Sequence, residues 1–203
     1  SQRKNAMTRY QTIDVSLRDG LCVLQHNRPE RLNARNSQMY AEIITALEVA
    51  SEDASVCAVM LTGSGTAFCA GMDFNNDFTM ATTALPDDSD RVRSVKAQLS
   101  ALEPRRAVFE LARKFVAAFI NFDKPLIGAV NGAAIGEGFS SLLHCDVVYA
   151  SPSAYFWAPF ARAGAAPEFC ATMLATRRLG PTLGNAALYL SRKITAAEAQ
   201  RAG

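Results

Sequence analysis

The stretch "KPLIGAVNGAAIGEGFSSLLHCDVVYA", residues 124–150, decides the fold of this chain. Its opening run, 124–130, predicts a buried strand, 138–145 predicts a short helix, and 146–150 predicts a second strand. A turn at 131–132 and a run of small residues lie between the first strand and the helix. A strand, a helix and a strand in this order predict a parallel pair with a right-handed crossover, as in an α/β layer.

The sequence on either side of this stretch continues the alternation of strands and helices. Residues 10–27 alternate apolar and polar side chains around Asp19-Gly20, which predicts a hairpin. Apolar residues at helical spacing predict helices over 36–53 and 107–122. The other expected elements are a short buried strand over 57–63 and, near the end, a helix with a capping box formed by Thr195 and Glu198. The sequence therefore predicts an α/β fold.

One segment, 79–104, interrupts this rhythm. It combines a cluster of acidic residues with Arg91, Arg93 and Lys96 and has no clean apolar face. We expect a long, mobile excursion here, of the kind that often borders a binding site.

The totals limit the classes of protein that this chain can belong to. We expect one domain over 9–203, preceded by a disordered tail or cloning remnant over 1–8. The net charge of +2 is too small and too evenly spread for a nucleic-acid surface. The most apolar stretch is interrupted by glycines and Glu137, so we expect no membrane span. Five scattered cysteines without a CxxC pair indicate reduced thiols inside a cell, and two isolated histidines predict no metal site.

Two small-residue segments are candidates for chemistry. "AFCAGMDF", 67–74, leaves a strand through small residues, and "NGAAIGEGFSSLL", 131–143, leads through small residues into a helix start. Free backbone N–H groups at such places favour negative charge. If the two segments face one another, they could hold a developing oxyanion.

A third segment, "FARAGAAPEFCATML" at 160–174, places Pro167 and Glu168 where an apolar helix is expected to begin. Proline suits the first helical position, and an acid in the first turn complements the helix dipole. Helix chemistry alone could therefore explain Glu168, and a catalytic carboxylate is the alternative.

Five segments, in this order along the chain, resemble those of a known family: "NRPERLNARN" (27–36), "FCAGMDF", 122–151, "WAPFARAGAAPEFC" and "RKITAAEAQRAG". The family that they resemble is the crotonase, or enoyl-CoA hydratase/isomerase, superfamily. The resemblance runs from about residue 10 to the last residue. It implies a spiral of repeated ββα units that carries an acyl-CoA site, with the family's C-terminal helical region absent from this chain. It also implies that the backbone N–H groups of Met72 and Glu137 form an oxyanion hole.

Within the superfamily, the resemblance favours the Δ3,Δ2-enoyl-CoA isomerases of the peroxisomal type. The positions that match the paired glutamates of the hydratases hold Ser140 and Phe160, which cannot transfer a proton at neutral pH. The isomerases use one glutamate, and Glu168 falls on it. The implied activity moves a 3-enoyl-CoA double bond to the 2-position in unsaturated fatty acid β-oxidation. The chain departs from these isomerases at Glu137, where they have an apolar residue, and at Phe169, which replaces a glycine.

The resemblance carries further expectations. Besides the catalytic Glu168, it implies substrate contacts at Ala34, Ala70, Gly71, Asp73, Phe74, Ile135, Gly136 and Phe160. CoA is part of the substrate, so no separate cofactor is expected, and the full-length protein is expected to form a homotrimer. The expected location is intracellular: a peroxisome or mitochondrion in a eukaryote and the cytoplasm in a bacterium. Arg28, Arg31 and Arg35 either contact CoA phosphates or form a solvated face.

Two other functions remain open. Chromodomain Y-like proteins carry a related domain without the catalytic acid, which serves in interaction or CoA binding, and Glu168 argues against that role here. A divergent crotonase, such as a thioester hydrolase that uses Glu137, is the second alternative.

Overall fold

The computed structural model describes residues 10–74 and 82–203, so the expected tail over 1–8 and residues 79–81 of the expected excursion lie outside the described residues. The strands are β1 (Ile13–Arg18), β2 (Leu21–His26), β3 (Ala58–Gly63), β4 (Ala67–Cys69), β5 (Leu126–Val130), β6 (Ala133–Ile135), β7 (Val147–Ala150), β8 (Tyr155–Trp157) and β9 (Ile194–Thr195). The helices are α1 (Ser37–Glu52), α2 (Asp90–Ser100), α3 (Pro104–Ile120), α4 (Glu137–Leu142), α5 (Ala171–Tyr189) and α6 (Ala196–Ala202).

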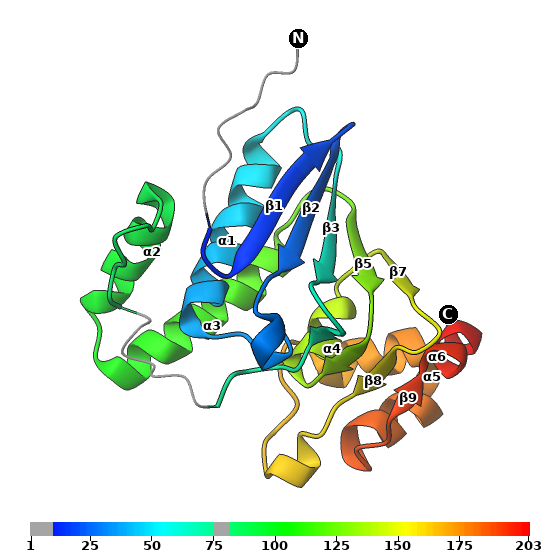
Figure 1. Ribbon diagram of the computed structural model, residues 1–203. Coiled ribbons are helices and arrows are strands. Elements are labelled where there is room, and N and C mark those ends of the chain that lie inside the picture. Colours follow the sequence, from blue (N-terminus) through cyan, green and yellow to red (C-terminus); the bar gives the residue numbers. More distant parts are fainter. Residues whose placement is uncertain (1–9, 75–81) are drawn as a thin grey trace.

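The strands form two sheets that share one repeating unit (Figure 1). The larger sheet has the order β1-β2-β3-β5-β7, and the smaller has the order β4-β6-β8-β9. In three successive units, β3/β4, β5/β6 and β7/β8, the first strand joins the larger sheet and the second joins the smaller. Strands from successive units pair in parallel, whereas the β1–β2 hairpin predicted from Asp19-Gly20 is antiparallel. This spiral confirms the predicted α/β fold class.

Helices α1 and α3 pack on one face of the larger sheet (Figure 1). Asn36 caps α1 by accepting a hydrogen bond from the Met39 amide at 2.9 Å, and the helix buries Met39, Ile43 and Leu47 against the core. α4 begins just after β6, so its first residue, Glu137, lies beyond the carboxyl end of this inner strand of the smaller sheet.

The expectation of an irregular excursion is wrong for part of the segment, because residues 90–100 form α2. Ser89 caps this helix, whose inner face buries Val92, Val95 and Leu99. Lys96 shares that face, fully buried, with its Nζ 2.8 Å from an Asp88 oxygen. A buried lysine in the apolar stripe hides the helical pattern in the sequence.

The expectation that Pro167 opens a helix is also wrong. Helix α5 begins four positions later, at Ala171, because Phe169 and Cys170 have left-handed φ angles of 58° and 55°. Glu168 therefore lies in the loop before α5. Among the helices that the structure describes, none has the length and apolar character needed to cross a membrane.

Candidate active site

The loop 70–73, which follows β4, is held by a short parallel pairing with the segment before α1. The Arg35 amide donates to the Gly71 carbonyl at 2.8 Å, and the Asp73 amide donates to the Arg35 carbonyl at 2.9 Å. In such a pairing the residue between the two bonded positions directs its own N–H and C=O to the other side. The Met72 N–H therefore faces away from Arg35.

Glycine brings this loop against the start of α4. Gly71 has φ +94°, and a methyl group added to it would lie 3.0 Å from the Ile135 carbonyl oxygen and 3.8 Å from the Glu137 amide nitrogen. A methyl group on Gly138 would lie 2.5 Å from the Cys69 carbonyl oxygen. These close approaches require glycine and bring the two predicted small-residue segments together.

Two backbone N–H groups at this junction remain available. Glu137 is the first residue of α4, where an N–H has no partner within the helix. Within 10–74 and 82–203, neither its N–H nor that of Met72 has a hydrogen-bond acceptor. Two such donors on adjoining backbones can stabilise negative charge on an oxygen placed between them.

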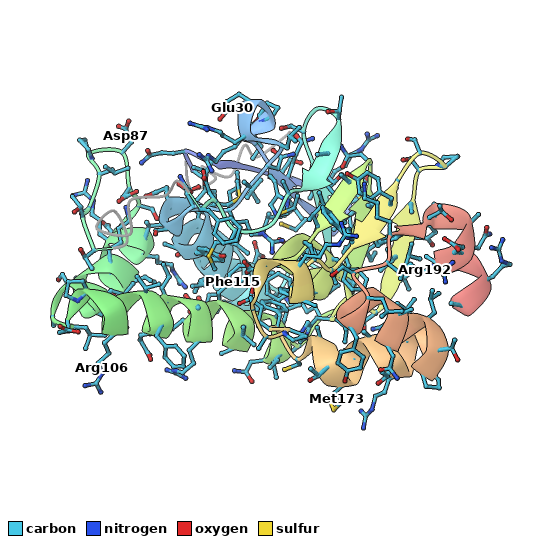
Figure 2. The ribbon with its side chains drawn as sticks, turned by 90° about the horizontal axis from the view of Figure 1, so that it is seen from below. Glu30, Asp87, Arg106, Phe115, Met173 and Arg192 are labelled. Carbon is cyan, nitrogen blue, oxygen red and sulfur yellow. The ribbon has the colours of Figure 1, made fainter. Side chains whose placement is uncertain are left out.

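The Glu137 side chain is buried, at 5% exposure, and points to neighbours from the N-terminal half. The Tyr40 hydroxyl of α1 donates to its Oε2, and Arg35 Nη1 lies 3.7 Å from its Oε1. Arg35 is itself fully buried, over the ring of Phe115, which lies in the middle of the molecule (Figure 2). The Glu137 carboxyl is thus enclosed by protein groups rather than by solvent.

Burial governs the titration of this cluster. Desolvation raises the pKa of Glu137 to about 7, although Arg35 and the Tyr40 hydrogen bond oppose the rise. Burial and the adjacent Arg35 lower the pKa of His26 to about 3. His26 is therefore neutral, with Nδ1–H donating to the Phe68 carbonyl at 3.1 Å and Nε2 facing Arg35 Nη2 at 3.5 Å. At neutral pH, Glu137 is close to half protonated.

Glu168 is exposed, and among the described residues no hydrogen bond reaches its carboxyl group. Partial desolvation nevertheless raises its pKa, and its charge in turn contributes to the raised pKa of Glu137. A carboxyl group with a raised pKa and no internal partner is free to accept a proton from a ligand.

Residues 16–203 match the family described as Enoyl-CoA hydratase/isomerase. The chain belongs to this family. Among solved structures, an enoyl-CoA hydratase/isomerase from Pseudoalteromonas atlantica T6c superposes with a TM-score of 0.76 at 33% identity, covering 95% of this chain and 67% of that one. The chain is thus a crotonase-superfamily member.

Curated relatives place this family member near the isomerases. Enoyl-CoA delta isomerase 2 of Homo sapiens is 38% identical over 192 residues, which are 95% of this chain and 44% of the relative. Enoyl-CoA delta isomerase 3, peroxisomal, of Mus musculus is 36% identical, over 94% of this chain and 55% of the relative. The Chromodomain Y-like protein of Homo sapiens is also 36% identical, over 94% of this chain and 29% of the relative. The chain spans about half the length of the isomerases or less.

The other predicted substrate-contact residues of this family member lie on the segments before α1, after β4, before α4 and after β8. Ile135 and Gly136 lead into α4, and the Gly136 amide donates to the Trp157 carbonyl at 2.7 Å. Ala70 donates its amide to the Leu32 carbonyl. Phe160 is buried at the start of a short 3-10 turn, Ala161–Ala163. Phe74, in contrast, is 84% exposed.

The three arginines before α1 differ in their availability. Arg35 is buried in the Glu137 cluster and cannot reach a phosphate in solvent. Arg28 Nη1 lies 3.0 Å from an Asp73 oxygen and donates to the Ala34 carbonyl at 2.6 Å. Arg31 alone of the three is exposed. The expectation of a common phosphate-binding or solvated cluster is therefore wrong for Arg35.

Sequence reasoning missed two side chains that shape the site, Tyr40 and His144. Tyr40 lies in the apolar stripe of α1, where its pattern is that of an ordinary core residue. A buried tyrosine hydroxyl needs a hydrogen-bond partner, and this need is the available signal for its pairing with Glu137. His144 follows α4 and donates to the segment after Glu168.

One cavity in the described structure lies elsewhere. It measures about 430 Å³ between α1, α2 and α3, and no predicted site residue lines it. Among its charged residues, Arg91 is paired with Glu52 and Arg113 with Glu110. The described residues contain no group of three or more His, Cys, Asp or Glu side chains suited to a metal ion.

Proposed function

We propose that this chain carries the active site of a Δ3,Δ2-enoyl-CoA isomerase, with an acyl-CoA thioester as substrate. The observation that carries the proposal is the pair of available N–H groups, from Met72 and Glu137, on adjoining backbones. The Glu168 carboxyl, with its raised pKa, supports it as the proton carrier. The named isomerase relatives give independent support.

The proposed reaction needs one carboxylate. A 3-enoyl thioester has acidic hydrogens at C2 because the carbonyl and the neighbouring double bond both stabilise the resulting anion. The Glu168 carboxylate removes one of these protons, and the electron pair moves onto the thioester oxygen to form a dienolate. Glu168 then returns the proton to C4, which leaves the double bond between C2 and C3. General acid–base assistance of this kind contributes roughly 10²–10⁴-fold.

The two N–H groups serve the same step from the other side. The negative charge of the dienolate develops on the thioester oxygen, where the amides of Met72 and Glu137 would donate. A preorganised donor at such an oxygen contributes about 3–4 kcal/mol to the transition state. Water addition is not part of the proposal: Ser140 is buried with its Oγ donating to the Gly136 carbonyl at 3.2 Å, and Phe160 has no proton to transfer.

The test is the substitution Glu168→Gln, which preserves shape and removes the base. We expect isomerase turnover of a 3-enoyl-CoA to fall at least about a hundredfold, with CoA-ester affinity within about threefold of the parent. Turnover is followed by the conjugated enoyl absorbance and affinity by calorimetry. Activity within threefold of the parent would refute the assignment, as would brisk loss of 2-enoyl absorbance through hydration.

The relationship to the Chromodomain Y-like protein supports a second candidate, a domain that binds acyl-CoA or a protein partner without turnover. The same assay separates the two, because a binding domain retains CoA-ester affinity and shows no isomerase activity in the parent. Thioester hydrolysis by Glu137 is less well supported, since its carboxyl is enclosed by Tyr40 and Arg35. Release of free CoA thiol would identify it.

We also propose that the protein assembles as a homotrimer and acts in a peroxisome or mitochondrion, or in the cytoplasm of a bacterium. Apolar side chains exposed on β7, on α5 and at the residue just after α5 support an assembly: Val147, Val148, Tyr149, Met173, Tyr189 and Leu190. Met173 points outward from α5 (Figure 2). Sedimentation of the protein tests the assembly, with a monodisperse monomer as the contrary result.

A further inference from the structure

The backbone immediately after Glu168 adopts an unfavourable conformation. Phe169 and Cys170 have φ angles of 58° and 55° in succession. A left-handed φ is uncommon for residues other than glycine, and for a bulky side chain it is an outlier that the surrounding structure must enforce. The segment that carries the proposed base is therefore held in place by contacts from elsewhere.

Those contacts come from an aromatic cluster around Phe169, which is only 5% exposed. The rings of Phe115 and Phe119, both on α3, lie 5.5 Å and 5.2 Å from the Phe169 ring, centroid to centroid. His144 lies closer, at 4.7 Å and nearly perpendicular. Edge-to-face geometry of this kind adds directional preference to simple burial.

His144 also holds the backbone. Its Nε2 lies 3.0 Å from the Phe169 carbonyl oxygen. A carbonyl only accepts, so His144 must carry a proton on Nε2 and donate it. Burial lowers the pKa of His144, helped by the positive charge of Arg178 on α5, although the hydrogen bond to the Phe169 carbonyl opposes this, and the neutral Nε2–H tautomer makes that bond. One side chain thus fixes both the ring and the carbonyl of the residue that follows the base.

We propose that His144 and Phe169 are positioning residues for the Glu168 carboxyl group. This inference rests on the proposed function, because positioning has its effect in proton transfer by Glu168. Within the described residues the carboxyl has no hydrogen bond of its own, so its place is set by the left-handed turn next to it. Small errors in the placement of a catalytic group lower turnover strongly, whereas substrate binding elsewhere is little affected.

The experiment compares His144→Leu, which removes the donor and keeps apolar bulk, with His144→Gln, which retains an amide donor. We expect His144→Leu to lower kcat about tenfold with KM within about threefold, and His144→Gln to restore kcat to within about threefold of the parent. Ile13→Ala, a buried substitution on β1, a strand that carries none of the proposed site residues, is the control: it lowers the melting temperature and leaves kcat unchanged at a temperature where all variants are folded.

Amide hydrogen exchange over residues 165–171 is measured on the same proteins. Exchange faster in His144→Leu than in His144→Gln or Ile13→Ala supports the positioning role, and equal exchange overturns it whether or not the parent is an isomerase. An inactive parent refutes the proposed function separately. Parental kcat in His144→Leu, or an equal loss in His144→Gln, also overturns the inference. If His144→Leu does not fold, Phe169→Gly takes its place. Glycine accepts the left-handed φ without strain, so faster exchange and a lower kcat in Phe169→Gly report the loss of the ring contacts alone.

Discussion

The oxyanion side of the candidate site is built from backbone, whereas the base side is held by side chains. On the first, Met72 and Glu137 are fixed by a parallel pairing, a helix start and glycines in close contact. On the second, Glu168 lies in a loop whose turn depends on the burial of Phe169 and a hydrogen bond from His144. The two halves of the proposed reaction would thus depend on different interactions.

This difference determines which amino-acid substitutions the oxyanion side and the base side tolerate. Backbone donors keep their direction as long as the strands and α4 are intact, and substitutions of the Met72 or Glu137 side chains leave the donors in place. The position of Glu168 depends on two side chains: Phe169, which follows it in the same loop, and His144, which lies outside the loop. A substitution should therefore displace the N–H donors of the oxyanion side only where it moves the backbone. It should displace Glu168 wherever it changes the aromatic cluster around Phe169.

The strongest test of this contrast is Gly71→Ala compared with Gly164→Ala. Both glycines have positive φ, +94° and +65°, but a methyl group on Gly71 meets the Ile135 carbonyl oxygen at 3.0 Å and one on Gly164 meets nothing within 4 Å. We expect Gly71→Ala to lower kcat for a 3-enoyl-CoA about a hundredfold, the loss typical of one oxyanion donor. Gly164→Ala should stay within about threefold of the parent, because its cost is confined to backbone strain.

Steady-state kinetics and circular dichroism of both variants check this expectation. Equal activities would mean that the approach of loop 70–73 to α4 does not matter for the reaction.

The sequence and the structure agree best where local patterns determine the outcome. The Asp19-Gly20 hairpin, the α1 stripe and the Thr195–Glu198 capping box follow from spacing and turn chemistry, and all three are present. The smaller sheet was harder to predict from the sequence. Its strands β4, β6 and β8 have three residues each, which are too few to show an alternation of apolar and polar side chains. The three ββα units share their topology without a detectable sequence repeat.

The site was predictable in its backbone and not in its side-chain network. Small residues at 70, 71, 136 and 138 indicate a close approach, and the structure provides the two strands, β4 and β6, that produce it. Nothing in a single sequence places Tyr40 or Arg35 beside Glu137, since they lie 97 and 102 positions away. The left-handed Phe169 contradicts its own residue preference, so only the tertiary contacts with Phe115 and His144 explain it.

The Glu137 cluster gives a second prediction, on stability against pH. The pKa of Glu137 is raised from 4.5 to about 7 on folding, so the folded chain binds this proton more tightly than the unfolded chain. The carboxyl's contribution to the free energy of unfolding is then largest below pH 4.5 and is lost as the pH rises toward 7. In Glu137→Gln the amide oxygen can face Arg35 while the amide NH2 donates to the Tyr40 hydroxyl oxygen, and the uncharged amide has no such pH-dependent loss.

We therefore expect the difference in the free energy of unfolding, Glu137→Gln minus parent, to rise by about 2 kcal/mol from pH 5 to pH 8. Urea unfolding of the two proteins at both pH values measures the difference. A constant difference across this range would show that the Glu137 carboxyl is not desolvated. Since the Glu137 N–H is a backbone group, isomerase activity of the variant at pH 8 should stay within about threefold of the parent.

The smallest expected effect concerns Arg31, the exposed member of the arginine group before α1. Arg28 and Arg35 are engaged in holding the oxyanion side, through Asp73 and Glu137 respectively, so they have little freedom to meet a CoA phosphate. If Arg31 meets one, Arg31→Ala should weaken CoA-ester binding about threefold at low ionic strength, and the difference should disappear near 0.5 M salt because exposed charges are screened.

The control is Arg18→Ala, at the far end of the β1–β2 hairpin. Arg18 is also exposed, so its loss changes the net charge equally and should leave affinity unchanged. Calorimetric titration with a CoA ester at two salt concentrations measures both variants. Equal affinities for Arg31→Ala, Arg18→Ala and the parent at low salt would leave Arg31 a solvated surface residue with no part in binding the ligand.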